Sequence, residues 1–367
     1  MSGNSLGERF RVASFGESHG PCVGIVVEGC PAGLRLARED IQKELDRRRP
    51  GVGDFVSQRR ERDEVEILSG LFMGRTTGAP LCLLIRNEGA DQSAYERMRS
   101  LPRPGHADFT AHVKYGGFND HRGGGRFSGR ITAGFVAAGA IAKTLLRMIG
   151  TEVFAHAKEI AGIEAGDVDL ETIKERREEM NPLGCLDPMA SRRMAAEILK
   201  SKSEGDSVGG IIECIVLNPP IGLGEPVFDT LDGDLAKAFF AIPGVKGVEF
   251  GAGFKASRMR GSECNDPFII EGGRVRTFTN NSGGILGGIS NGMPIICRIA
   301  IKPTPSIRKP QRTVDLERME EVELAVGGAH DPCIVPRAVP VVEAMAAITL
   351  ADHALRAGII PPVIEGG

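Results

Sequence analysis

The sequence predicts an α+β protein in which long helices are sandwiched between sheets. Residues 132–149 and 339–356 carry helical patterns that are apolar almost all round, and a helix of this kind is covered on more than one side. Short β-like runs lie before and between them without a strict strand–helix–strand alternation. Because a doubly wound parallel sheet requires that alternation, we expect the two helices to lie inside the molecule, between layers of strands.

Aliphatic and β-branched runs bounded by Gly, Pro or Asn predict the strands. In chain order these runs are residues 22–29, 64–70, 79–87, 209–220 and 293–303. Apolar residues at helical spacing predict the helices, which cover residues 38–49, 132–149, 170–180, 189–201 and 339–356. The charged residues 171–179 are expected on a solvated helix. Since no Pro/Ser-rich linker and no internal repeat divides the chain, residues 1–367 are predicted to form a single domain.

Composition argues against several function classes. The chain of 367 residues has a formal net charge of −3, whereas proteins that bind a phosphate backbone usually carry a basic excess, so nucleic acid is not an expected partner. The N-terminus lacks an apolar h-region, and no run of about eighteen uncharged apolar residues appears, so no membrane contact is expected. The eight cysteines show no CxxC pair or metal-ligand spacing, which predicts reduced thiols, no metal site and a cytoplasmic location.

Arginines stand at the start of both apolar helices. Residues 123–130 read GGGRFSGR and place Arg126 and Arg130 before the first helix, while HDPCIVPR ends with Arg337 before the second. A cation at a helix N-terminus is unfavourable until an anion joins it. We therefore interpret the two junctions as halves of one anion site, with a flexible structural loop as the alternative for GGGRFSGR. A Walker loop is not expected, because Arg130 and Ile131 replace its Lys and Ser/Thr.

Two further motifs bear histidines. GESHG (residues 16–20) matches the nucleophile-elbow pattern, but a strand follows it where an elbow requires a helix. Ser18 and His19 therefore lie either on a Gly-flanked turn close to a ligand or in an ordinary loop. In RPGHAD, His106 follows a Pro-Gly turn beside Asp108 and could act as a general acid, although a lone loop histidine gives no such assurance.

Other loops offer anion-binding groups. DRRRPG (residues 46–51) ends a predicted helix, where the helix dipole alone favours cations, yet three arginines in a row also suit phosphate or carboxylate. The Gly-rich stretch 281–292 and the KPTPSI loop, residues 302–307, could cradle phosphate or serve as plain turns. None of these motifs is decisive alone.

Taken together and in this order, GESHG, DRRRPG, RPGHAD, GGGRFSGR, GGILGG, KPTPS and HDPC…RAVPVVEAM closely resemble the chorismate synthase family across nearly the whole chain. The resemblance implies a carbon–oxygen lyase of the shikimate pathway of aromatic amino acid biosynthesis. The family removes phosphate and a C6 hydrogen from 5-enolpyruvylshikimate 3-phosphate by anti-1,4-elimination, giving chorismate, and requires reduced FMN. It also implies long helices between two antiparallel sheets and a homotetramer.

The resemblance assigns roles to individual residues. His19 is expected to protonate the departing phosphate, His106 to protonate the reduced flavin, and Asp331 to assist removal of the C6 proton together with flavin N5. Ser18, Arg48, Arg130 and Arg337 resemble the groups that hold the substrate. The expected flavin contacts are Arg126, Phe127, Ser128, Gly287, Lys302, Pro303, Thr304, Pro305 and Ser306.

The chain departs from the family pattern at four places. Ala329 replaces a common Arg before His-Asp, Pro243-Gly244 replaces Asn-Ala or Gln-Ala, and Phe127 replaces a small residue. Asp54 stands where an Arg is associated with nicotinamide (NADPH) binding, so an external source of reduced flavin is expected. A non-catalytic homologue that binds flavin or phosphate is the alternative function. A serine hydrolase and an RNA-binding protein are less compatible with GESHG leading into a strand and with the scarcity of Tyr and Trp.

Overall fold

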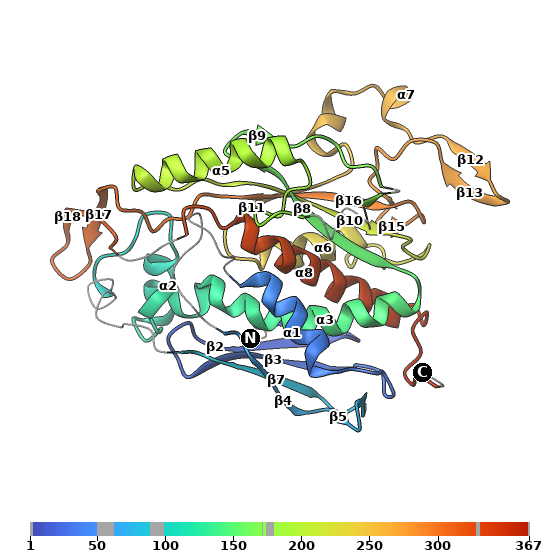
Figure 1. Cartoon of the computed structure of the whole chain (residues 1–367), viewed down its shortest axis with the longest axis horizontal. Helices are drawn as coiled ribbons and strands as arrows, with labels where there is room; N and C mark the ends of the chain where they lie inside the picture. Colours follow the sequence, from blue (N-terminus) through green and yellow to red (C-terminus); the bar gives the residue numbers. More distant parts are fainter. Residues whose placement is uncertain are drawn as a thin grey trace.

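The computed structural model describes residues 3–49, 62–88, 99–170, 172–173, 180–327 and 331–365. Within these residues the chain forms two five-stranded antiparallel sheets with helices between them (Figure 1). The first sheet has the strand order β1-β2-β3-β7-β4. Its strands are β1 (Ser5–Leu6), β2 (Arg11–Gly16), β3 (Cys22–Glu28), β4 (Val65–Ser69) and β7 (Leu81–Arg86).

The second sheet has the order β11-β16-β10-β8-β9, and its strands also pair antiparallel. They are β8 (Glu152–Ile160), β9 (Ile163–Glu164), β10 (Gly210–Leu217), β11 (Val245–Phe250) and β16 (Ile295–Ile301). Alternate residues of β10, such as Ile212 and Cys214, face the main core, while Ile215 belongs to a smaller cluster on the other face.

Three helices fill the space between the sheets. Helices α1 (Arg38–Arg48), α3 (Thr132–Met148) and α8 (Val335–Arg356) pack on one another, α3 against β3 and α8 against β8 and β10 (Figure 1). Every residue from Thr132 to Lys143 in α3 and from Ala338 to Ala354 in α8 is buried. At their crossing, a Cβ on Gly139 would lie 2.3 Å from the Cβ of Ala344, so the close approach requires glycine. The sandwich predicted from the sequence is confirmed.

The remaining elements cover or extend this sandwich. Helix α5 (Pro188–Ser203) lies on the outer side of the second sheet and α6 (Leu231–Phe240) beside α8 (Figure 1). Short helices are α2 (Asp108–Tyr115), η2 (Arg122–Phe127), η3 (Gly129–Ile131), η4 (Gly253–Arg258) and α7 (Gly261–Cys264). Two-stranded pairs are β5 (Leu71–Phe72) with β6 (Arg75–Thr76), β12 (Phe268–Glu271) with β13 (Arg274–Thr277), β14 (Ile285–Leu286) with β15 (Ile289–Ser290), and β17 (Gln311–Asp315) with β18 (Glu320–Leu324).

All five predicted strands form, and four predicted helices form with ends within a few residues of the expected ones. The fifth predicted helix, residues 170–180, falls mostly outside the described residues. Helix α8 begins at Val335 and not at 339, because Pro336 fits the first helical turn. Arg337 therefore lies in that first turn instead of preceding the helix.

The longest strand missing from the sequence interpretation is β8, which lies inside the second sheet. His156 and Lys158 interrupt its apolar pattern, yet both are buried. Glu213 on the neighbouring strand lies 3.2 Å from His156 Nε2, and Lys158 Nζ lies 2.8 Å from Asp167. Tertiary partners thus allow polar residues in a buried strand.

Gly129–Met148 and Val335–Arg356 are long and apolar enough to cross a membrane by length and composition. Their most apolar windows are 83% and 94% buried inside the protein. Both segments therefore serve as core helices of the sandwich.

Candidate active site

A cavity of about 670 Å³ opens where the end of α1, the start of α3 and the start of α8 meet. Most of the site residues predicted from the sequence line it. These are Arg48, His106, Arg126, Phe127, Ser128, Arg130, Lys302, Pro303, Thr304, Pro305, Ser306, Asp331 and Arg337. The structure therefore brings together the two arginine-bearing helix starts, 207 positions apart in the sequence when counted from Arg130 to Arg337.

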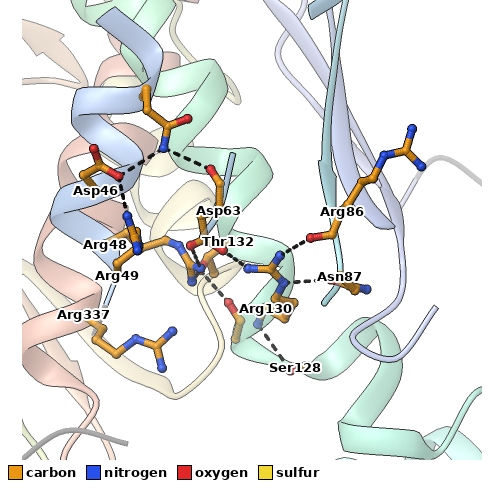
Figure 2. Close-up of polar contacts among 12 residues, drawn as sticks. Asp46, Arg48, Arg49, Asp63, Arg86, Asn87, Ser128, Arg130, Thr132 and Arg337 are labelled. Carbon is orange, nitrogen blue, oxygen red and sulfur yellow. Dashed lines mark hydrogen bonds and ion pairs between the residues drawn. The ribbon is translucent and has the colours of Figure 1, made fainter. Parts of the chain in front are cut away.

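Asp63 joins two of the arginines in the cavity wall. Its Oδ2 lies 2.5 Å from Nη2 of Arg48, and its Oδ1 accepts a hydrogen bond from Nη1 of Arg130 (Figure 2). All three side chains are almost completely buried. Burial opposes ionisation of Asp63, but the two arginines outweigh it and lower the pKa of this carboxyl. The arginine pair thus has a counter-ion within the chain.

Arg48 retains hydrogen-bonding capacity toward the cavity. Its Nη1 is 3.4 Å from Thr132 Oγ1, and its Nε has no hydrogen-bond partner among the described residues. Burial, together with the positive charges of Arg337 and Arg130, lowers the pKa of Arg48 to about 10 despite Asp63. Arg48 is therefore a buried cation that an additional anion would stabilise.

The second helix contributes a separate ion pair. Arg337 Nη1 lies 2.6 Å from Asp331 Oδ2, and Figure 2 shows Arg337 approaching Arg48 from α8. We call Arg48, Asp63, Arg130, Asp331 and Arg337 the cavity cluster. Its three arginines exceed its two carboxylates by one charge. The three arginines are thus partly neutralised within the protein, because Asp63 and Asp331 lie between or beside them.

The three consecutive arginines of DRRRPG have three different environments. Arg47 lies 2.6 Å from Glu343 and 2.7 Å from Glu44, inside the helical layer. Arg48 lines the cavity, and the half-exposed Arg49 lies 3.1 Å from Asp46. Helix capping therefore does not account for the run, and only Arg48 faces the cavity.

The glycine-rich turn at residues 123–125 lies between the two predicted catalytic histidines. All three glycines have positive φ values of 57°, 84° and 50°. A Cβ on Gly123 would lie 2.4 Å from His19 Nε2, and a Cβ on Gly124 would lie 3.1 Å from His106 Nε2. Glycine is required here both for the left-handed backbone and for the approach of the two rings.

Arg103 and Asp108 fix the orientation of His106. Asp108 Oδ1 lies 2.6 Å from His106 Nδ1 and 2.9 Å from Arg103 Nη2. Arg103 also donates to Ser306 Oγ over 3.0 Å. Burial opposes ionisation of Asp108, but hydrogen bonds from Arg103 and His106 lower the pKa of this carboxyl overall. Arg103 Nη2 also lies 3.2 Å from His106 Nε2, so the carboxylate and the guanidinium together hold the ring in place.

The 302–306 loop forms another wall of the cavity. Lys302 Nζ donates to the carbonyl of Gly105, and Thr304 Oγ1 donates to the carbonyl of Asp331 over 3.1 Å. Burial and the nearby charge of Lys246, which also lines the cavity, lower the pKa of Lys302. The two lysines add further positive charge beside the cavity cluster.

Three of the predicted site residues do not line the cavity in the described part of the chain: Ser18, His19 and Gly287. Ser18 and His19 are buried in the β2–β3 turn, behind Gly123, and are not among the described residues that line the cavity. Asn87 connects this turn to the cavity cluster, because it donates to the carbonyls of Glu17 and Gly20 and accepts from Arg130 Nε. The turn joins two strands, which confirms that GESHG is not a nucleophile elbow.

Gly287 lies in the turn between β14 and β15, and the structure does not place it among the described residues that line the cavity. Arg126 does line the cavity, but its guanidinium donates to the carbonyl of Gly16 and to Asn4 Oδ1, at 2.9 and 3.0 Å. Of the departures from the family pattern, Pro243-Gly244 and Phe127 line the cavity. Ala329 and Asp54 lie outside the described residues.

Sequence reasoning missed Asp63, Asn87, Arg103 and Lys246. Asp63 has a positive φ of 50°, a conformation that Asp tolerates better than most residues, but no local motif identifies it. Of these four residues, Arg103 is the one that lies within a motif already singled out, RPGHAD, so the sequence could have identified it. These charged or polar residues gain their role only when separate loops meet.

The fold and the cavity define an α+β sandwich protein with an arginine-lined cavity between its helix ends and loops. Comparison with known proteins gives the family. The family model described as chorismate synthase matches residues 10–355. The chorismate synthase of Dehalococcoides mccartyi is 59% identical over 99% of both chains. That of Korarchaeum cryptofilum is 57% identical over 97% of this chain and 98% of its own.

A solved structure supports the same family. A chain described as the crystal structure of chorismate synthase superposes with a TM-score of 0.74 at 32% identity, covering 96% of this chain and 93% of that chain. The chain therefore belongs to the chorismate synthase family, and the resemblance drawn from its seven motifs is confirmed.

Proposed function

We propose that the chain converts 5-enolpyruvylshikimate 3-phosphate to chorismate by anti-1,4-elimination of phosphate and a C6 hydrogen, using reduced FMN. The observation that carries this proposal is the convergence of His106, Asp331 and three arginines on one cavity of about 670 Å³. The substrate bears a phosphate and two carboxylates, and planar guanidinium groups suit both kinds of anion.

The cavity also suits a flavin. Its walls combine the hydroxyls of Ser128, Thr304 and Ser306 with lysine side chains, and the 38% exposed Phe127 adds an apolar surface. Lys302 to Ser306, with Arg126 to Ser128, are the residues that would hold the cofactor. When bound, reduced FMN would supply a transient electron that assists loss of phosphate from an unactivated allylic carbon. Gly287 stays a prediction that the geometry of the cavity does not support.

The side chains of the chain itself position the substrate and move protons. Arg48, Arg130 and Arg337 would bind its anionic groups, with Ser18 held close behind Gly123. His19 would protonate the departing phosphate, and Asp331, held by Arg337, would assist removal of the C6 proton. His106, with Asp108 at Nδ1, would deliver a proton from Nε2 to the reduced cofactor.

The direct test is anaerobic incubation of the purified protein with reduced FMN and 5-enolpyruvylshikimate 3-phosphate. We expect chorismate to accumulate, and its absence would refute the proposed activity in favour of a non-catalytic homologue. The same assay without added reduced flavin but with NADPH tests the expected need for an external reductant. No turnover with NADPH and oxidised FMN alone is the expected result.

The variant His106→Ala should reduce turnover by about 10²- to 10⁴-fold, the range typical of a general acid. His112→Ala is a matched control on the neighbouring helix α2, because His112 is not among the described residues that line the cavity. We expect the control to retain the wild-type rate within about twofold. An unchanged rate in His106→Ala would remove this residue from the proton pathway.

We further propose a single domain, a homotetramer and a cytoplasmic location. One continuous core runs from Phe10 to Ile360 and includes both sheets, which favours one domain. The β12–β13 hairpin projects from the body with the apolar residues Phe268 and Ile270 exposed (Figure 1), as expected for a chain that associates. Light scattering of the purified protein would test the tetramer.

A further inference from the structure

Asp63 is a buried carboxylate that contacts two arginines of the cavity lining, and the proposed reaction assigns it no role. Each of its oxygens meets a different arginine of the cavity cluster, Oδ2 on Arg48 and Oδ1 on Arg130 (Figure 2). Its relative exposure is 2%. Water therefore cannot substitute for the carboxylate in neutralising the two guanidinium groups.

The two arginines come from different elements. Arg48 ends α1, while Arg130 lies in η3 immediately before α3. Without Asp63, two buried like charges would repel each other. A fixed carboxylate between them sets the separation and orientation of both guanidinium groups before any ligand binds.

Asp63 also opposes the binding of an anionic ligand, because it is itself an anion on the same arginines. An anion bound to Arg48 must share the guanidinium with a carboxylate already on Nη2 and is repelled by its charge. The cavity cluster keeps one positive charge in excess, so an anion still binds, but less tightly than to an uncompensated arginine pair. Such weakening matters for a reaction that releases inorganic phosphate, because two uncompensated arginines, Arg48 and Arg130, would retain that product.

We propose that Asp63 is a positioning residue that acts as an internal counter-ion, holding Arg48 and Arg130 in place while limiting the affinity of the cavity for phosphate. This inference rests on the proposed function for the identity of the released anion. Its physical content, the competition between Asp63 and phosphate, can be measured without turnover.

The experiment is calorimetric titration of the full chain with inorganic phosphate. Asp63→Asn keeps the size of the side chain and its tolerance of a positive φ but removes the charge. We expect this variant to bind phosphate about tenfold more tightly than wild type, since one nearby charge is typically worth one or more tenfold steps. Its kcat should fall, because the arginines lose their fixed geometry, whereas its KM should not rise.

Two controls separate the charge from the structure. Asp63→Glu keeps the charge but displaces it, so phosphate affinity should stay within about twofold of wild type while kcat falls. Asp352→Asn removes another buried carboxylate, which accepts from the backbone N–H groups of Glu8, Arg9 and Phe10 far along α8. This variant should lower stability without changing phosphate affinity.

Unchanged or weaker phosphate binding by Asp63→Asn would overturn the counter-ion role. If this variant unfolds, refolding in phosphate should recover it, because the bound anion replaces the lost charge, and failure of phosphate to do so would also overturn the proposal. Should wild type form no chorismate, the proposed function fails. The phosphate titrations would still decide whether Asp63 competes with anions.

Discussion

Neighbouring arginines of helix α1 belong to two buried charge clusters with opposite properties. Arg47 joins Glu44, Lys143 and Glu343 in what we call the inner cluster, which links α1, α3 and α8. Arg48 belongs to the cavity cluster. The inner cluster has two cations and two carboxylates, whereas the cavity cluster has three cations and two carboxylates and faces a cavity.

The inner cluster satisfies its donors and acceptors within the protein. Lys143 Nζ lies 2.5 Å from Glu343 and 2.7 Å from Glu44, and the N–H of Ala155 on β8 donates to Glu343 over 3.1 Å. Burial opposes ionisation of Glu44, but Lys143 and Arg47 lower the pKa of its carboxyl. By contrast, Arg48 Nε has no partner among the described residues. Balanced pairing thus indicates a structural role, and unbalanced pairing beside a cavity indicates ligand binding.

The largest expected effect comes from breaking the balance of the inner cluster. Lys143→Met removes one of the two cations of the inner cluster and leaves both of its carboxylates, so the free energy of unfolding should fall by about 3–5 kcal/mol, as for other broken buried ion pairs. Urea unfolding measures this loss. Adding Glu343→Gln should recover part of it by removing the excess negative charge, while a loss below about 1 kcal/mol would mean that the cluster is not a structural link.

A smaller effect, and on activity instead of stability, is expected at the cavity cluster. Arg48→Gln removes the cation with unused donors, so kcat/KM should fall about 10²-fold, equivalent to about 2.7 kcal/mol. Stability should change little, because Asp63 keeps Arg130 as its partner. The neighbouring variant Arg49→Gln alters only a half-exposed ion pair and should keep normal activity. Equal losses in both variants would contradict the distinction between these arginines.

The smallest expected effect concerns acid, and both clusters contribute to it. The pKa values of Glu44 and Asp63 are lowered in the folded protein. A lowered folded-state pKa gives stability that is present above the unfolded pKa, about 4, and is lost as the pH falls through the folded value.

Urea unfolding between pH 7 and pH 3 should therefore show stability falling below about pH 4.5. Glu44→Gln and Asp63→Asn should each reduce this acid-dependent loss, because each removes one carboxyl whose pKa is lowered by folding. Identical pH profiles in wild type and both variants would show that neither carboxylate has a lowered pKa.

Local patterns predicted much of the fold. The apolar circumference of α3 and α8 already required burial between layers, and short aliphatic runs identified β3, β7, β10 and β16. Strand β8 escaped prediction, because the partners that permit His156 and Lys158 to be buried lie on other elements. Helix α6, which supplies Phe240 to the cavity, was also missed.

The candidate site divides in the same way. The motifs identified His106, Arg48, Arg130, Arg337 and the 302–306 loop as one set, and the structure gathers them around one cavity. Gly287, predicted only through the family resemblance, does not join them. Arg47 and Arg48 looked equivalent in DRRRPG, since a run of like residues in a helix gives no indication of which one faces a ligand.

The sequence by itself determined the family, the buried helices and the placement of arginines near two helix starts, because glycine turns, apolar periodicity and arginine placement are local properties of the chain. Only the tertiary structure decided how those charges are compensated. Asp63 reaches Arg48 and Arg130 across 15 and 67 positions, and Glu343 reaches Lys143 across 200. The reason is that the free energy of a buried charge depends on which groups packing brings within a few ångströms of it.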